Sequence, residues 1–97
     1  MNIQKHIKIY GNVQGVGYRY WLQSFALEYE IYGWVKNNVE GEVEAVLIGE
    51  EEEVVINLIE QCYLGPPNAN VKKIIVEDIS DMNDKYNLRS FEIVTDN

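Results

Sequence analysis

The chain has 97 residues, of which 46% are hydrophobic, so we expect one domain, residues 1–97, with one packed core and no extended disorder. Eight basic and sixteen acidic residues give a net charge of −8, which argues against general nucleic-acid binding because phosphates require a basic face. A single cysteine, Cys62, excludes an internal disulfide, and no stretch has the pattern of a signal peptide or the length of a membrane span, so we expect a cytoplasmic protein.

The first half of the chain predicts a strand, a glycine loop, a helix and a hairpin. Residues 6–10, HIKIY, alternate apolar and polar side chains as a strand does. Residues 18–30 carry apolar side chains at the spacing of one face of a helix. Residues 31–37 and 42–48 are rich in β-branched and aromatic types, and the turn at 38–41 joins them into a hairpin.

The second half predicts one more helix and one or two strands. The acidic run 50–53 suits a helix start, since carboxylates complement the helix dipole, and residues 65–67, Gly-Pro-Pro, end that helix. Residues 71–79 predict a fourth strand. A polar loop at 80–89 follows, and residues 90–94 predict a short fifth strand.

The resulting order is βαββαβ, the split βαβ arrangement of an α+β fold. We therefore expect a ferredoxin-like α/β sandwich, in which an antiparallel sheet carries both helices on one face. Right-handed crossovers place the first and third strands in the centre of the sheet.

The segment 11–19, GNVQGVGYR, places three glycines directly before the first helix. Glycine adopts positive φ readily, which lets consecutive N–H groups converge on an anion. No Ser, Thr, Asp or Asn between Gln14 and Tyr18 can cap the helix, and Arg19 adds a cation where the helix dipole disfavours one. A bound anion would satisfy the amides and Arg19 together. The alternative is a tight strand–helix connection with Arg19 simply exposed.

Asn37 stands near the end of the second predicted strand. That strand should run parallel to the first with the third between them, so the carboxyl ends of both lie on one edge, about 10 Å apart. A phosphate, a water and an arginine side chain fill such a gap. Asn37 can donate and accept hydrogen bonds there, although it also suits an ordinary turn beside Asn38.

A site of loop amides, one Arg and one Asn is poor in acid–base groups. Around this edge the sequence offers no Ser-His-Asp set, no reactive cysteine and no metal-ligand cluster, and His6 is expected near the opposite edge as a surface residue. Such a site suits a leaving group that needs no proton. The carboxylate released from an acyl phosphate qualifies because its pKa is about 4, whereas an alkoxide needs an acid or a metal.

Two blocks of this sequence resemble the acylphosphatase family. GNVQGVGYR is similar to the family signature, and GWVKN, residues 33–37, is similar to its second block; spacing, size and element order also match. The resemblance implies hydrolysis of the carboxyl–phosphate anhydride of acyl phosphates to carboxylate and inorganic phosphate, without metal, other cofactor or covalent intermediate. It implies that Arg19 binds the phosphate and Asn37 positions the attacking water. It also implies a cradle of backbone amides from Gln14, Gly15, Val16, Gly17, Tyr18 and Arg19.

On this basis we expect a monomer whose partners are a small acyl phosphate and the phosphate product, with no nucleic acid and no membrane. Two alternatives stay open. The first is a non-catalytic phosphate-binding or regulatory module, because the same domain type is found inside larger carbamoyl-transfer proteins. The second is RNA recognition, since RNA-binding domains share this strand order and stack bases on exposed strand aromatics such as Tyr10.

Overall fold

The structure is a computed structural model that describes residues 2–79 and 90–95. Its elements, in chain order, are β1 (Ile3–Asn12), α1 (Tyr18–Glu28), β2 (Tyr32–Asn37), β3 (Val43–Gly49), α2 (Glu52–Cys62), β4 (Asn70–Asp78) and β5 (Phe91–Val94). Every predicted helix and strand is present, with ends shifted by a few residues. The predicted polar loop at 80–89 lies outside the described residues.

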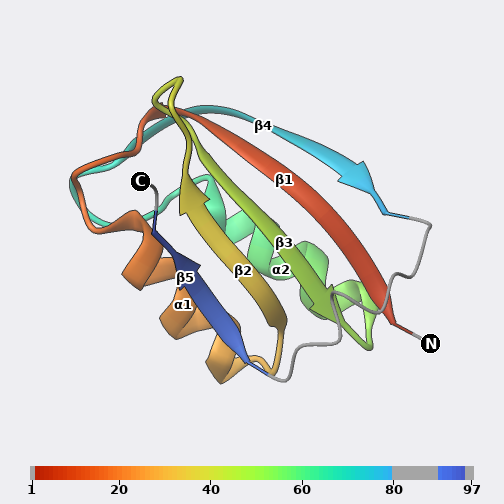
Figure 1. The fold of residues 1–97 in the computed structure, drawn as a ribbon. Helices are drawn as coiled ribbons and strands as arrows, with labels where there is room; N and C mark the ends of the chain where they lie inside the picture. The colour runs from red at the N-terminus through yellow and green to blue at the C-terminus, as the bar shows by residue number, and fades with distance from the viewer. Residues whose placement is uncertain (1, 80–89, 96–97) are drawn as a thin grey trace.

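The strands form one sheet in the order β4-β1-β3-β2-β5, with both helices on one face (Figure 1). The pairings among the first four strands are antiparallel, which confirms the predicted βαββαβ sandwich with β1 and β3 inside it. The short fifth strand is also present. It pairs with β2 in parallel, so the complete sheet is mixed rather than purely antiparallel.

The register of β3 determines which strand ends meet. Val43 pairs with Ile9 of β1 on one side and with Asn37 of β2 on the other. Because both pairings are antiparallel, β1 and β2 are parallel and their carboxyl ends share one edge of the sheet. The loop to α1 leaves β1 at this same edge (Figure 1).

The core lies between the sheet and the two helices. Alternate residues of each strand point into it, as the period of two requires, and the helices contribute one face each. The fully buried side chains include Ile7, Ile9, Tyr18, Leu22, Val35, Val43, Leu47, Val55, Leu58 and Cys62. Burial of such a face is the main source of stability for helices only 11 residues long.

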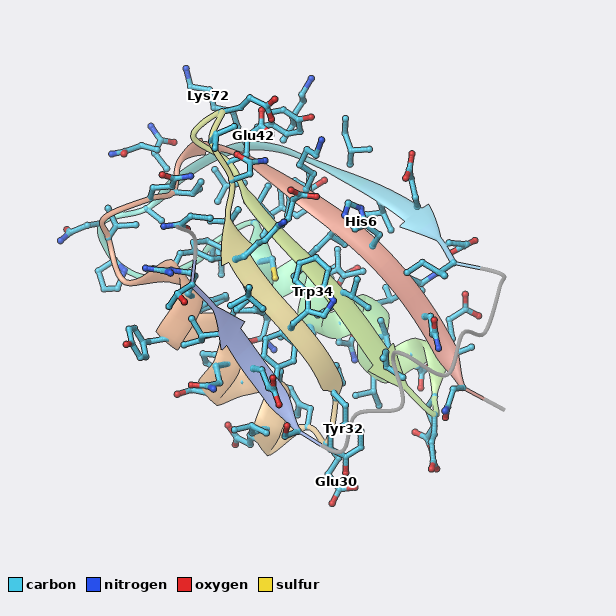
Figure 2. The ribbon with its side chains drawn as sticks, in the orientation of Figure 1. His6, Glu30, Tyr32, Trp34, Glu42 and Lys72 are labelled. Carbon is cyan, nitrogen blue, oxygen red and sulfur yellow. The ribbon has the colours of Figure 1, made fainter. Side chains whose placement is uncertain are left out.

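Neither α1 nor α2 covers the opposite face of the sheet, which carries a polar and aromatic cluster (Figure 2). Trp34 lies on this face, half-buried, with the Lys36 ammonium 5.7 Å from its ring centre, and does not belong to the core. His6, in the middle of β1, is half-buried and bonds to the Glu44 carboxylate at 3.0 Å. The sheet thus places His6 among partners rather than on an open surface.

Glu44 has its pKa set by opposing effects. Burial alone would raise the pKa of its carboxyl. Hydrogen bonds with His6 and Asn38, together with the charges of His6 and Lys36, outweigh burial and hold the pKa below its usual value of 4.5.

Gly33 of β2 should tolerate no side chain. Its φ is +136°, and a Cβ built on it would lie 1.9 Å from the carbonyl oxygen of Val46. We expect Gly33→Ala to lower the free energy of unfolding by more than about 2 kcal/mol, through overpacking and an unfavourable φ. Gly41→Ala is the matched control, because Gly41 also has positive φ but open space around it, and should cost about 1 kcal/mol. Urea unfolding measures both; equal losses would contradict the steric explanation.

Glu44→Gln should make the thermal stability of the protein depend less on pH in the acid range. A carboxyl whose pKa is lower in the folded state contributes stability above its unfolded pKa and loses it as pH falls through the folded value. The wild type should therefore lose more thermal stability than Glu44→Gln below about pH 4.5. Exposed Glu28 supplies the control variant Glu28→Gln, which should follow the wild type. Parallel profiles for wild type and Glu44→Gln would contradict this prediction.

Candidate functional site

The loop between β1 and α1 presents a run of free backbone N–H groups. Gly15 and Gly17 adopt positive φ, +75° and +84°, with open space around both. Gly17 is the N-cap residue of α1, makes no side-chain cap, and is followed by no acidic residue in the first turn. Within residues 2–79 and 90–95, no acceptor is hydrogen-bonded to the N–H groups of residues 14–20. These amides and the helix dipole together favour an anion.

Arg19 is the second residue of α1, where the sequence placed it. Its side chain is half-buried, and it forms no ion pair with any acidic residue that the structure describes. A guanidinium in the first turn of a helix adds to the positive end of the dipole instead of offsetting it. The loop amides and Arg19 therefore both add positive charge at the start of α1, and no described acidic side chain pairs with Arg19.

Asn37 is the last residue of β2 and is half-buried. Its Oδ1 is buried and has no hydrogen-bond partner among the described residues. An unpartnered buried polar atom is costly, so it calls for an explanation such as a water or a ligand group. The register of β3 sets this amide on the edge where the loop begins, as the sequence predicted.

Gln14 has a role for its side chain that the sequence analysis missed, since only its backbone amide was assigned to the site. The Gln14 Nε2 donates to the carbonyl oxygens of Asn38 and Glu42, each at 2.9 Å. It therefore ties the loop to the β2–β3 turn that follows Asn37. The sequence feature that indicates such a role is the long amide side chain of Gln14 in a loop that otherwise contains small and apolar residues.

Tyr18 contributes its side chain to the core. Its hydroxyl donates to the carbonyl oxygen of Cys62, the last residue of α2, which fixes the start of α1 against the second helix. Burial raises the pKa of the Cys62 thiol to about 12, and burial also raises the pKa of Tyr18 well above its usual value. Neither residue supplies an anionic nucleophile at neutral pH.

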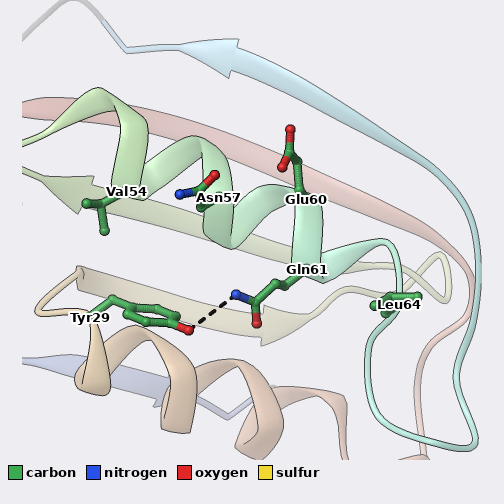
Figure 3. Close-up of a pocket in the computed structure, with 6 residues that line it drawn as sticks. All are labelled: Tyr29, Val54, Asn57, Glu60, Gln61 and Leu64. Atoms are coloured by element: carbon green, nitrogen blue, oxygen red, sulfur yellow. Dashed lines mark hydrogen bonds between the residues drawn. The ribbon is translucent and has the colours of Figure 1, made fainter.

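The groove between the helices is separate from this site (Figure 3). It is lined by Tyr29, Val54, Asn57, Glu60, Gln61 and Leu64. Tyr29 follows the carboxyl end of α1, about 16 Å along the helix from the loop. Gln61 Nε2 donates across the groove to the Tyr29 hydroxyl at 3.3 Å.

Two kinds of site are absent from the described part of the chain. No cluster of three or more His, Cys, Asp or Glu side chains there is placed to hold a metal ion. Neither α1 nor α2 is long and apolar enough to cross a membrane.

Solved structures of two other proteins share this fold over nearly the whole chain. An acylphosphatase from Bacillus subtilis is 33% identical, with a TM-score of 0.86 over 95% of this chain and 98% of the other. A full-length HypF structure in a phosphate- and nucleotide-bound form is 29% identical, with a TM-score of 0.83 over 98% of this chain but only 12% of HypF. The same fold thus occurs as most of a small protein and as part of a larger one.

Comparison of sequences gives the family directly. An acylphosphatase from Rhodopseudomonas palustris is 44% identical over 85 residues, 88% of this chain and 83% of that protein. A sequence model of the acylphosphatase family matches residues 5–93, which include both the glycine loop and Asn37. The chain therefore belongs to the acylphosphatase family, the hydrolases of acyl phosphates.

Proposed function

We propose that this acylphosphatase binds the phosphoryl group of its substrate with the backbone amides of residues 14–19 and the Arg19 guanidinium, and that Asn37 positions the attacking water. The observation that carries this proposal is the coincidence of free polar groups at one sheet edge. The N–H groups of the loop and the Oδ1 of Asn37 have no partner among the described residues, although polar groups in folded proteins are generally paired.

The chemistry requires little proton transfer from the protein. The water oxygen forms a bond to phosphorus, the bond between phosphorus and the bridging oxygen breaks, and the electron pair leaves with the carboxylate. The carboxylate needs no proton because its conjugate acid has a pKa of about 4. The proton of the water passes to a phosphoryl oxygen, so the products are carboxylate and inorganic phosphate.

The protein's contribution is therefore placement and charge. Donors fixed before the reaction stabilise the equatorial oxygens of the transferring phosphoryl group at no reorganisation cost. Holding the water near phosphorus replaces a bimolecular encounter. Asn37 suits this task because its Oδ1 can accept a hydrogen bond from the water.

The alternative of a non-catalytic module that binds phosphate is disfavoured by the family, since the chain belongs to the hydrolases of acyl phosphates. Turnover separates the two candidates. The RNA alternative is disfavoured by the net charge of −8, because surfaces that bind RNA are basic.

Arg19→Ala should abolish turnover. Benzoyl phosphate is the substrate, its hydrolysis is followed by ultraviolet absorbance in the presence of EDTA, and we expect the loss in kcat/KM to exceed about 100-fold, as for removal of one transition-state donor. Thermal unfolding should change little, because Arg19 makes no ion pair among the described residues. Lys36→Ala removes the same charge one residue from Asn37 and should change kcat/KM less than about threefold. Full activity in Arg19→Ala would exclude the assigned cradle.

Asn37→Ala should separate catalysis from binding. We expect kcat to fall by more than about 100-fold while the inhibition constant of inorganic phosphate changes less than about threefold, because Asn37 is proposed to contact the attacking water and not the phosphate. Steady-state kinetics with phosphate as a competitive inhibitor gives both values. Asn57→Ala, an exposed amide at the interhelical groove, is the matched control and should behave as wild type. Equal losses in kcat and phosphate affinity would make Asn37 a ground-state contact.

A further inference from the structure

We infer that the side chain of Gln14 is a positioning residue that sets the distance between the phosphate cradle and Asn37. The inference rests on the proposed function, because it assigns a task to the link between the two halves of that site. The cradle belongs to the β1–α1 loop and Asn37 to the end of β2, so they come from separate segments. Their relative position has to be held to well within 1 Å for a water to reach phosphorus, since misplacement by 1 Å can cost about 100-fold in rate.

The β2–β3 turn is already closed by its own hydrogen bonds. The Asn38 N–H donates to the Glu42 carbonyl at 2.9 Å, and the Gly41 N–H donates to the Asn38 carbonyl at 3.3 Å. The Oδ1 of Asn38 accepts from the N–H groups of Glu40 and Glu42. The turn therefore does not require Gln14 in order to form.

Gln14 bonds to acceptor sites on the turn carbonyls that the turn's own hydrogen bonds leave free. Each backbone carbonyl oxygen has two lone pairs, and the carbonyls of Asn38 and Glu42 each accept one bond inside the turn. The Gln14 Nε2 donates to the second acceptor site of both, at 2.9 Å each. Both bonds are made by one nitrogen, so the side chain is held from two directions.

This contact is the one hydrogen-bonded link between the loop and the turn in the part of the chain that the structure describes. One of the two acceptors is the carbonyl of Asn38, directly after Asn37. Figure 2 shows Glu42, the other acceptor, at the end of the hairpin where β1 also turns toward the loop. A rigid amide thus connects the start of the cradle to the residue adjoining Asn37.

Gln14→Met tests the inference because it keeps the length and apolar stem of the side chain and removes both donors, while the backbone amide of residue 14 stays. We expect kcat for benzoyl phosphate to fall about 10- to 100-fold, with the inhibition constant of inorganic phosphate changed less than about threefold. In the Asn37→Ala background, the same substitution should change kcat less than about twofold, because the water no longer depends on Asn37. A fully additive loss would show a general structural effect and overturn the inference.

Gln23→Met is the matched control. The Gln23 Nε2 also donates from a half-buried side chain to a backbone carbonyl, that of Phe91, at 2.8 Å, but it joins α1 to β5. It should keep kcat within about twofold of wild type. If Gln14→Met lowered kcat no more than Gln23→Met, the loss of any loop or helix tether would explain the effect and the inference would fail.

Gln14→Glu is the second variant, in case Gln14→Met does not fold. An ionised carboxylate is an acceptor only and is repelled by the two carbonyls, whereas the protonated acid can donate one bond. The kcat of Gln14→Glu relative to wild type should therefore recover as pH is lowered through the titration of the new carboxyl. A pH-independent ratio would contradict the positioning role. Absence of turnover in the wild type would instead refute the proposed function, which keeps the two failures distinct.

Discussion

The double pairing of β3 is the constraint on which the rest of the structure depends. One strand aligns Ile9 of β1 and Asn37 of β2 against the same residue, Val43. Antiparallel pairing on both sides forces β1 and β2 to end at the same edge, two strand spacings or about 10 Å apart. Backbone hydrogen bonds therefore fix how far apart the ends of β1 and β2 lie. The loop that follows β1 is not part of this ladder, so its position relative to Asn37 depends on other contacts such as those of Gln14.

The two helices differ in the charge of the side chains in their first turns. The first turn of α2 contains Glu52 and Glu53, whose carboxylates offset the positive end of the dipole. The first turn of α1 has no acidic residue and carries Arg19. A surface helix that lacks both a cap and a compensating charge is less stable than it could be. This arrangement lies at the same sheet edge as Asn37, whose Oδ1 also has no partner among the described residues. A bound anion, as proposed above, would supply the missing negative charge.

The overall charge of −8 is compatible with an anionic substrate because local donors dominate. Surface charges farther away than about 8 Å are largely screened at physiological ionic strength. Several lysines are also occupied elsewhere: Lys5 bonds to Asp78 at 2.6 Å, and Lys36 and Lys73 lie over aromatic rings. Arg19, by contrast, forms no ion pair among the described residues and stands at the start of α1 beside the loop amides.

The sequence by itself determined the element order, the glycine loop with Arg19, and Asn37 at the end of β2, because periodicity, glycine and capping are local properties of the chain. It did not determine that β5 pairs in parallel with β2, that Trp34 lies outside the core, or that Gln14 reaches the β2–β3 turn. Each of these depends on contacts between residues far apart in sequence. Composition limits which contacts a side chain can make, but only the folded sheet decides which partner lies within hydrogen-bonding distance.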